Sequence, residues 1–128
     1  SGWSAGGHLA AMALSHEAVA AGLAISGIFE LAPLADTYLN EKLSLSRAEI
    51  ADLSPLRRAP VMKPLAITYG GNELPALVAN SHAFHAARAR AGAPGPLIPV
   101  AGADHFSILD AMRTPDGALT GALLDVVR

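Results

Sequence analysis

Three short apolar runs, each set between turn-forming residues and separated from the next by a helical pattern, constrain the fold of this chain most. They are residues 23–28, 64–69 and 96–100. A short apolar run of this kind is typical of a strand that is buried on both faces, as the strands of a parallel sheet are. Pro99 has no amide hydrogen to donate to a neighbouring strand, which indicates that the third strand lies near the edge of the sheet.

Helical patterns lie before, between and after these runs. Residues 5 to about 20 are rich in alanine, which predicts a helix of small side chains packed close to another element. Pro75 suits the first position of a second helix, expected over residues 76–91. Two further helices are expected over 107–112 and 118–127. Strands that alternate with helices predict an α/β fold, with a parallel sheet flanked by helices.

One segment interrupts this alternation. Residues 30–62 contain three prolines, several charges and only one short helix. The start of that helix is marked by Ser46 and, three residues later, Glu49, which is the pattern of a capping box. A chain of 128 residues is about one domain long. We therefore expect a single domain over residues 1–128, with an excursion over the edge of the sheet at about 30–62.

Composition argues against several classes of partner. Apolar residues make up 52% of the chain and charged residues 16%, which favours a globular core over disorder. The net charge of −2 offers no basic surface to nucleic acid, and no segment approaches the ~20 apolar residues needed to cross a bilayer. The absence of cysteine excludes disulfides and thiolate metal sites. We expect no nucleic-acid or membrane partner and, by default, a cytoplasmic location.

The first residues contain the pattern Gly-x-Ser-x-Gly, with Ser4 at its centre. Glycines two positions before and after a serine allow a sharp turn from strand to helix that exposes the hydroxyl group. The same residues also occur in ordinary turns, but here an alanine-rich helix starts at once. The Ala5 amide would then lie at a helix N-terminus, directed at a developing oxyanion. Ser4 is therefore our candidate nucleophile, and Ala5 our candidate backbone donor of the oxyanion hole.

A serine nucleophile needs a histidine to remove its proton. Among five histidines, His105 alone lies in a loop directly after a predicted strand, where a general base can be presented. His8, His16, His82 and His85 lie on predicted helices and are interpreted as surface or packing residues. The last two could form a metal-binding pair, but no third ligand lies at helical spacing beside them. We expect neither a metal nor a cofactor.

The histidine in turn needs a carboxylate to orient it. Glu73 follows a predicted strand in a glycine-rich loop, from which a carboxylate could reach His105 from behind. Asp104 is the second candidate. Adjacent residues of an extended loop tend to point apart, so Asp104 is better placed to cap the helix that begins near Ser107. Glu73 is the preferred acid.

Several segments in register resemble one family of enzymes. They are residues 2–9, 25–31, 54–56, 70–75 and 105–107. Together they resemble the kynurenine formamidase (arylformamidase) branch of the α/β-hydrolases, which is related to the hormone-sensitive-lipase-like esterases. By position, the resemblance implies Ser4 as nucleophile, His105 as base and Glu73 as triad acid. Many members of the family have Asp in place of Glu73, and Trp3 stands where histidine is more usual.

The resemblance implies a serine hydrolase that acts on a small N-formyl aryl amide, similar to N-formylkynurenine, or on a short ester, through an acyl-enzyme. No cofactor is implied, the partner is the small-molecule substrate, and a homodimer is compatible with it. A general carboxylesterase of the same fold is an alternative. The family's strand before the nucleophile and its His-Gly-Gly oxyanion loop are absent from the chain. We therefore expect the C-terminal portion of the fold, with the alternative of an inactive fragment or a binding module.

Overall fold

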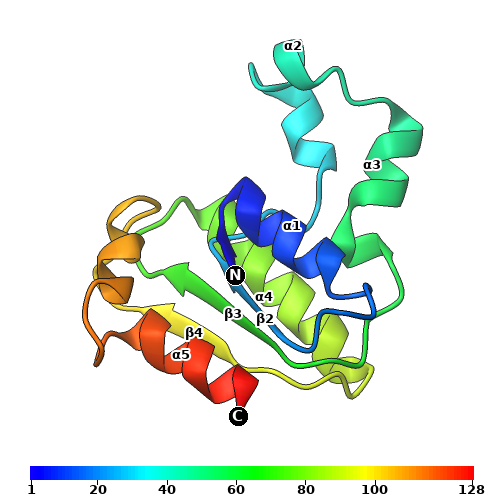
Figure 1. The fold of residues 1–128 in the computed structure, drawn as a ribbon. Coiled ribbons are helices and arrows are strands. Elements are labelled where there is room, and N and C mark those ends of the chain that lie inside the picture. The colour runs from blue at the N-terminus through cyan, green and yellow to red at the C-terminus, as the bar shows by residue number, and fades with distance from the viewer.

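Four strands form one parallel sheet in the computed structural model, which describes residues 1–128. The strands are β1 (Gly2–Trp3), β2 (Gly22–Ile25), β3 (Leu65–Gly70) and β4 (Leu97–Val100). They lie in the sheet in chain order, each pairing in parallel with the next. Figure 1 shows β2, β3 and β4 running side by side. The predicted α/β class is confirmed, and β4 lies at an edge of the sheet, as Pro99 indicated.

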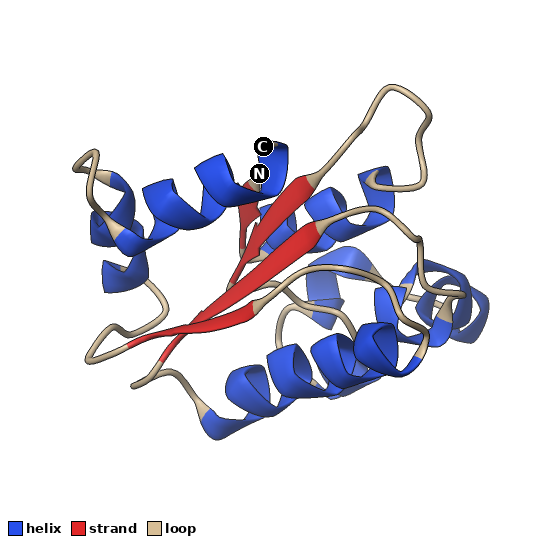
Figure 2. Cartoon of the chain, turned by 90° about the horizontal axis from the view of Figure 1, so that it is seen from below, coloured by secondary structure: helices blue, strands red, loops and turns tan.

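Helices cover both faces of the sheet, as Figure 2 shows. One face is covered by α1 (Ala5–Ala13) and α4 (Pro75–Arg90), and the other by α5 (Ala118–Val127). The segment expected to be a helix at 107–112 is the 3₁₀ helix η3 (Ser107–Met112), which packs with α5. None of these helices combines the length and apolar character needed to cross a membrane.

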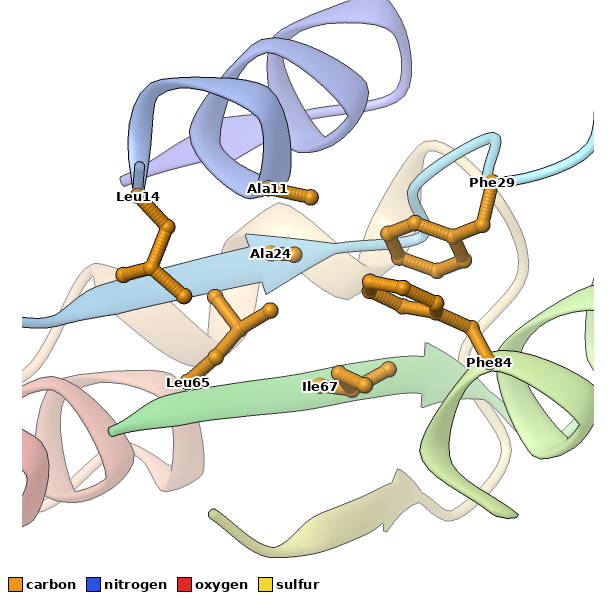
Figure 3. Packing of buried hydrophobic residues seen from close by; sticks show 7 residues of the cluster. All are labelled: Ala11, Leu14, Ala24, Phe29, Leu65, Ile67 and Phe84. Atoms are coloured by element: carbon orange, nitrogen blue, oxygen red, sulfur yellow. The ribbon is translucent and has the colours of Figure 1, made fainter. Parts of the chain in front are cut away.

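The strands bury both faces, so the core has two layers. In β2, Ala24 faces α1 and α4, whereas Leu23 and Ile25 face α5. All three are at most 2% exposed, because successive side chains of a strand point to opposite faces and both faces are covered here. The layer under α4 includes the stacked rings of Phe29 and Phe84, whose centroids lie 4.3 Å apart (Figure 3).

Two boundaries differ from those predicted from the sequence. Helix α1 ends at Ala13, not near residue 20, because the chain must turn back to enter β2. Lys63 holds this turn by donating to the carbonyls of His16 and Val19, both at 2.7 Å. The strand expected over 23–28 ends at Ile25, because the next residue, Ser26, has a left-handed backbone with φ of 47°. Both departures depend on tertiary contacts.

The strand expected to be absent before the nucleophile is partly present. Gly2 and Trp3 form β1 and pair in register with Ala24 and Ile25. Two residues are enough to fix the direction from which the chain enters the turn at Ser4. The prediction of a missing strand is therefore wrong for its last two residues.

Four short helical elements occupy the segment between β2 and β3. They are η1 (Ala32–Asp36), α2 (Asn40–Leu43), α3 (Arg47–Leu53) and η2 (Pro55–Arg57). Figure 1 shows α2 far from the sheet, at the top of the view. The predicted capping box at the start of α3 is present, because the Ser46 side chain accepts from the Glu49 amide and the Glu49 carboxylate accepts from the Ser46 amide.

Glu30 anchors both ends of this segment. Its carboxylate accepts from the Arg57 side chain at 2.8 Å, from the Ala32 amide at 2.9 Å and from the Ser54 hydroxyl at 3.3 Å. Burial acts to raise the pKa of Glu30, but these hydrogen bonds, that of Arg57 first, outweigh burial and lower the pKa below its ordinary value of 4.5.

This lowered pKa predicts a pH-dependent contribution to stability. A carboxyl group with a depressed folded-state pKa stabilises the protein above its unfolded pKa and loses that effect as the pH falls through the folded pKa. Glu30→Gln should therefore lower the free energy of unfolding by about 1 kcal/mol at neutral pH, and by progressively less below pH 4.5. Urea unfolding of both proteins across this pH range measures the difference. A difference independent of pH would contradict the assignment.

Close contact between α1 and the loop after β2 requires glycine at position 7. A Cβ atom there would lie 2.8 Å from the Gly27 Cα atom and 3.1 Å from the Ile25 carbonyl oxygen. Gly7→Ala should therefore destabilise the protein by about 1–3 kcal/mol. Gly6→Ala is the matched control, because a Cβ atom at Gly6 has no neighbour within 4 Å. It should raise stability by about 0.5–1 kcal/mol through helix propensity, and equal unfolding midpoints for the two variants would contradict this packing argument.

Candidate active site

Ser4 occupies a one-residue turn between β1 and α1. Its backbone angles, φ 56° and ψ −117°, lie outside the regions that side-chain-bearing residues usually adopt. The Ser4 amide donates to the Ile25 carbonyl at 2.9 Å, which ties the strained turn to β2. A Cβ atom at Gly2 would lie 2.1 Å from the Gly6 carbonyl oxygen, so the turn requires glycine at position 2. This is the geometry in which a strand-to-helix turn exposes a serine hydroxyl.

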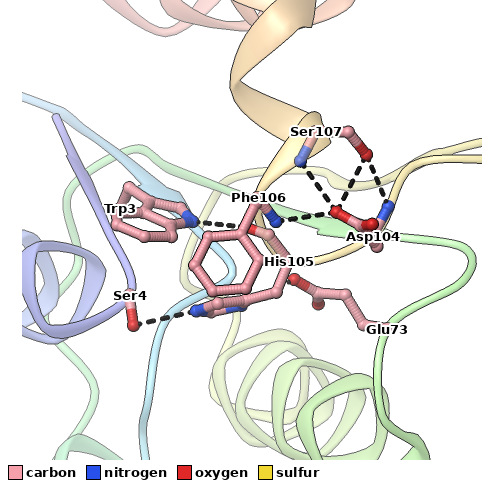
Figure 4. A network of polar contacts seen from close by, with 7 residues as sticks. All are labelled: Trp3, Ser4, Glu73, Asp104, His105, Phe106 and Ser107. Atoms are coloured by element: carbon pink, nitrogen blue, oxygen red, sulfur yellow. Dashed lines mark hydrogen bonds and ion pairs between the residues drawn. The ribbon is translucent and has the colours of Figure 1, made fainter.

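The structure brings Ser4, His105 and Glu73 together (Figure 4). The His105 Nε2 atom lies 3.0 Å from Ser4 Oγ, and its Nδ1 atom lies 2.9 Å from Glu73 Oε1. The three residues follow β1, β4 and β3, whose carboxyl ends meet at one edge of the parallel sheet. This common edge explains how residues so far apart in the sequence become neighbours.

The contact with Glu73 sets the roles of the two imidazole nitrogens. An ionised carboxylate only accepts hydrogen bonds, so the tautomer that suits this contact has its hydrogen on His105 Nδ1, which donates a hydrogen bond to Glu73 Oε1. Nε2 is then an acceptor and faces the Ser4 hydroxyl. In this tautomer the imidazole can take the proton of Ser4, as a general base must.

The Glu73 side chain is fully enclosed by the rest of the chain. It has no solvent exposure, whereas that of His105 is 22% exposed. One carboxylate oxygen, Oε1, accepts from His105, while Oε2 is buried and has no partner within the chain. Low local dielectric strengthens a charge-assisted hydrogen bond of this kind.

Asp104, the second candidate acid, points away from His105. Its Oδ1 atom accepts from the amides of Phe106 and Ser107 at 2.9 and 2.8 Å, and from the Ser107 hydroxyl at 2.9 Å (Figure 4). These bonds, that of the Ser107 amide first, lower the pKa of Asp104. Asp104 thus closes the turn that leads into η3, whereas the N-cap residue of η3 is Phe106, so the predicted capping role is met only by the turn before the helix.

The first turn of α1 supplies free donors beside the serine. Ala5 is the first residue of α1, and its amide donates to no group of the chain. Such amides at a helix N-terminus carry the positive end of the helix dipole. The Ala5 N–H is therefore an unpaired donor beside Ser4, and its role in an oxyanion hole stays a prediction.

Three of the other four histidines contact groups elsewhere in the chain. His8 Nε2 contacts the Leu53 carbonyl at 2.7 Å, His16 Nδ1 accepts from the Ala18 amide at 3.2 Å, and His82 Nε2 contacts the Tyr69 hydroxyl at 2.9 Å. No group of three or more His, Cys, Asp or Glu side chains is arranged to share a metal ion.

Trp3 is a site residue that the sequence reasoning noted only as a departure from the family. Its indole Nε1 donates to the His105 carbonyl at 2.7 Å, across 102 positions of the sequence. The signal available beforehand was its position next to the nucleophile. Its partner could not be predicted from the sequence, because the contact depends on how β1 and the loop after β4 meet.

Curated relatives resemble the whole of this chain. It is 29% identical over 140 aligned positions to kynurenine formamidase of Danio rerio, and 29% identical over 141 positions to kynurenine formamidase of Salmo salar. Both alignments cover 98% of the chain and 48% of the relative. The chain thus spans about half the length of these relatives. No protein-family model matches the chain.

Solved structures share its fold. A provisionally assigned thioesterase from Silicibacter sp. TM1040 superposes with a TM-score of 0.79 at 26% identity, covering 96% of this chain and 48% of its own. An esterase from Thermogutta terrifontis superposes with a TM-score of 0.65 at 25% identity, covering 96% and 50%. Acylaminoacyl peptidase of Pyrococcus horikoshii, at 19% identity and a TM-score of 0.71, shows likeness of fold alone and covers 98% and 22%.

Proposed function

We propose that this chain, which has the α/β-hydrolase fold and is related to kynurenine formamidases and esterases, carries the nucleophile, base and acid of a serine hydrolase. The single observation that supports this most is the continuous relay from Ser4 Oγ through His105 to Glu73, with contacts of 3.0 and 2.9 Å. A strained serine backbone at a helix N-terminus supports the same assignment.

In the proposed acylation step, Ser4 Oγ attacks the carbonyl carbon of the substrate while His105 Nε2 takes the hydroxyl proton. Glu73 stabilises the imidazolium that forms, and the Ala5 amide donates to the oxyanion. Collapse of the tetrahedral intermediate breaks the bond to the leaving amine or alcohol, which receives the proton from Nε2. Ser4 is left as an acyl ester.

Deacylation repeats this sequence with water. His105 Nε2 removes a proton from water, whose oxygen attacks the acyl carbon, and the proton then passes to Ser4 Oγ as the ester bond breaks. For a formamide substrate the products are an aryl amine and formate. The relay is restored and no cofactor is consumed.

We propose a small N-formyl aryl amide as the substrate. Support comes from the kynurenine formamidase relatives and from Phe106, which is 72% exposed and whose ring centroid lies 5.5 Å from that of His105. An exposed ring beside the base can pack against an aryl group. The related esterase structure favours a short ester as the second candidate.

Turnover of two substrates by the complete protein separates these candidates. We expect kcat/KM for N-formylkynurenine to exceed that for p-nitrophenyl acetate. The reverse order would assign the protein as a general carboxylesterase. Absence of turnover of both, together with no labelling of Ser4 by a serine-directed phosphonate, would leave a binding module and overturn the proposed hydrolase.

We also propose that residues 1–128 form part of a single domain that is inactive by itself. The chain covers about half of its relatives, and the Ala5 amide is the one oxyanion donor we assign within it. Assay of the isolated 128 residues beside the complete protein tests this. Equal esterase activity in the two samples would contradict it.

A further inference from the structure

The indole of Trp3 connects the nucleophile turn to the loop that carries the base. It extends from the residue before Ser4, and its Nε1–H donates to the His105 carbonyl at 2.7 Å (Figure 4). We propose that Trp3 is a positioning residue that sets where His105 stands relative to Ser4. This inference rests on the proposed hydrolase function, because it assigns a role within the same site.

The main chain of His105 depends on this contact. No backbone amide donates to the His105 carbonyl, so the indole is its hydrogen-bond partner. On the other side of the loop, Asp104 is fixed by its bonds to Phe106 and Ser107. The two sets of contacts hold the backbone of His105 from both sides. Without Trp3, the main chain of His105 would have no hydrogen bond to the rest of the chain, and only its imidazole would keep contacts, with Ser4 and Glu73.

Ring contacts restrict the imidazole further. The Trp3 ring centroid lies 5.0 Å from that of His105, with the planes tilted by 38°. The Phe106 ring meets His105 edge-on at 5.5 Å and the Trp3 ring at 5.8 Å. Aromatic pairs at these separations attract one another beyond simple burial. Trp3 therefore contacts both the carbonyl and the imidazole of the base.

Trp3 is itself firmly held, as a positioning residue must be. Its backbone belongs to β1 and pairs with Ile25, and its side chain packs on the core layer that faces α5. Partly buried hydrophobic side chains on β4 and in η3, including Val100 and Met112, pack on the same layer. Trp3 is fixed to the sheet through β1 and is bonded directly to Ser4 in the chain. Its hydrogen bond therefore fixes the His105 main chain relative to both.

Displacement of a catalytic group by about 1 Å can lower a rate by about 100-fold. Trp3→Phe keeps an aromatic ring in the core layer but removes the N–H donor. We expect kcat to fall about 10- to 100-fold, with KM changed by less than about threefold, because substrate contacts stay in place while the base shifts. The rate of Ser4 labelling by a phosphonate should fall in parallel.

Tyr69→Phe is the matched control. It also removes one polar hydrogen from an aromatic side chain, at a 2.9 Å contact with His82. We expect wild-type kcat and labelling from this variant. If Trp3→Phe also keeps wild-type kcat and labelling, the positioning role is overturned. If both variants lose activity and thermal stability equally, the effect is general and the proposal is likewise overturned.

NMR of the complete protein tests the contact without using catalysis. If Trp3 is its only tryptophan, as it is of this chain, a single indole N–H resonance reports on it. We expect slow exchange of this proton with solvent, and a shift of the His105 imidazole nitrogen signals in Trp3→Phe but not in Tyr69→Phe. Indole exchange as fast as in free tryptophan overturns the inference. If the indole exchange and the imidazole shifts are as expected but the wild type turns over no substrate, the proposed function alone is overturned.

Discussion

Ser4→Ala should lower kcat by about 10⁴- to 10⁶-fold, because triad members act as a unit and removal of one stops the covalent route. The hydroxyl lies 3.0 Å from His105 Nε2, and its removal leaves the imidazole with no proton to take. Labelling by a fluorescent phosphonate should disappear at the same time. Steady-state rates and gel fluorescence of the complete protein measure both effects.

Ser15→Ala is the control for this prediction. Ser15 is an exposed serine after the end of α1, and its hydroxyl donates to the Met12 carbonyl at 3.0 Å. Rates and labelling should stay at the wild-type level in this variant. Unchanged labelling in Ser4→Ala would show that another residue reacts with the phosphonate, and Ser4 would lose its assignment as nucleophile.

Glu73→Gln should lower kcat by about 10⁴-fold, because a neutral amide no longer fixes the imidazole tautomer or stabilises its positive form. Burial increases the effect. The Glu73 side chain is fully enclosed and its Oε2 atom has no hydrogen-bond partner, so solvent cannot replace the lost carboxylate charge beside the imidazole. Thermal unfolding measured beside the rate separates loss of catalysis from loss of fold.

Asp104→Asn tests the second candidate acid. Asparagine keeps a side-chain oxygen for the Phe106 and Ser107 amides, so the turn should survive and kcat should change by only about twofold. Glu73→Asp should fall between these variants, with a loss of about 10- to 100-fold, because a shorter side chain no longer reaches Nδ1 at 2.9 Å. A larger loss of kcat for Asp104→Asn than for Glu73→Gln would make Asp104 the triad acid in place of Glu73.

The sequence predicted those elements whose signals are local. Apolar runs between turn residues located β3 and β4, Pro75 marked the start of α4, and the pair Ser46 and Glu49 marked the start of α3. Each of these patterns acts through neighbours a few residues away, so a single sequence contains it in full. The sequence also predicted that Ser4, Glu73 and His105 lie close together, because each follows a strand and parallel strands bring their carboxyl ends to one edge.

Features that depend on distant contacts were not predicted. Helix α1 ends early because Lys63 supports the turn after it, and this contact spans 44 to 47 positions of the sequence. Ser26 has a left-handed backbone, and its amide donates to the Thr68 carbonyl of β3, 42 positions away in the sequence. The hydrogen bond from Trp3 to the His105 carbonyl likewise joins residues far apart in the sequence. Only the packed fold specifies such pairs.

The order of the strands has a consequence for synthesis of the protein. A ribosome releases the chain from its N-terminus, so the four strands emerge in the same order in which they lie in the sheet. Ser4 therefore emerges before His105, which follows 101 positions later. In the proposed mechanism the serine has no base until the loop of His105 docks, and we expect the growing chain not to react with a phosphonate before then. The time at which Ser4 first reacts with a phosphonate would then show when β4 and the loop after it have joined the sheet.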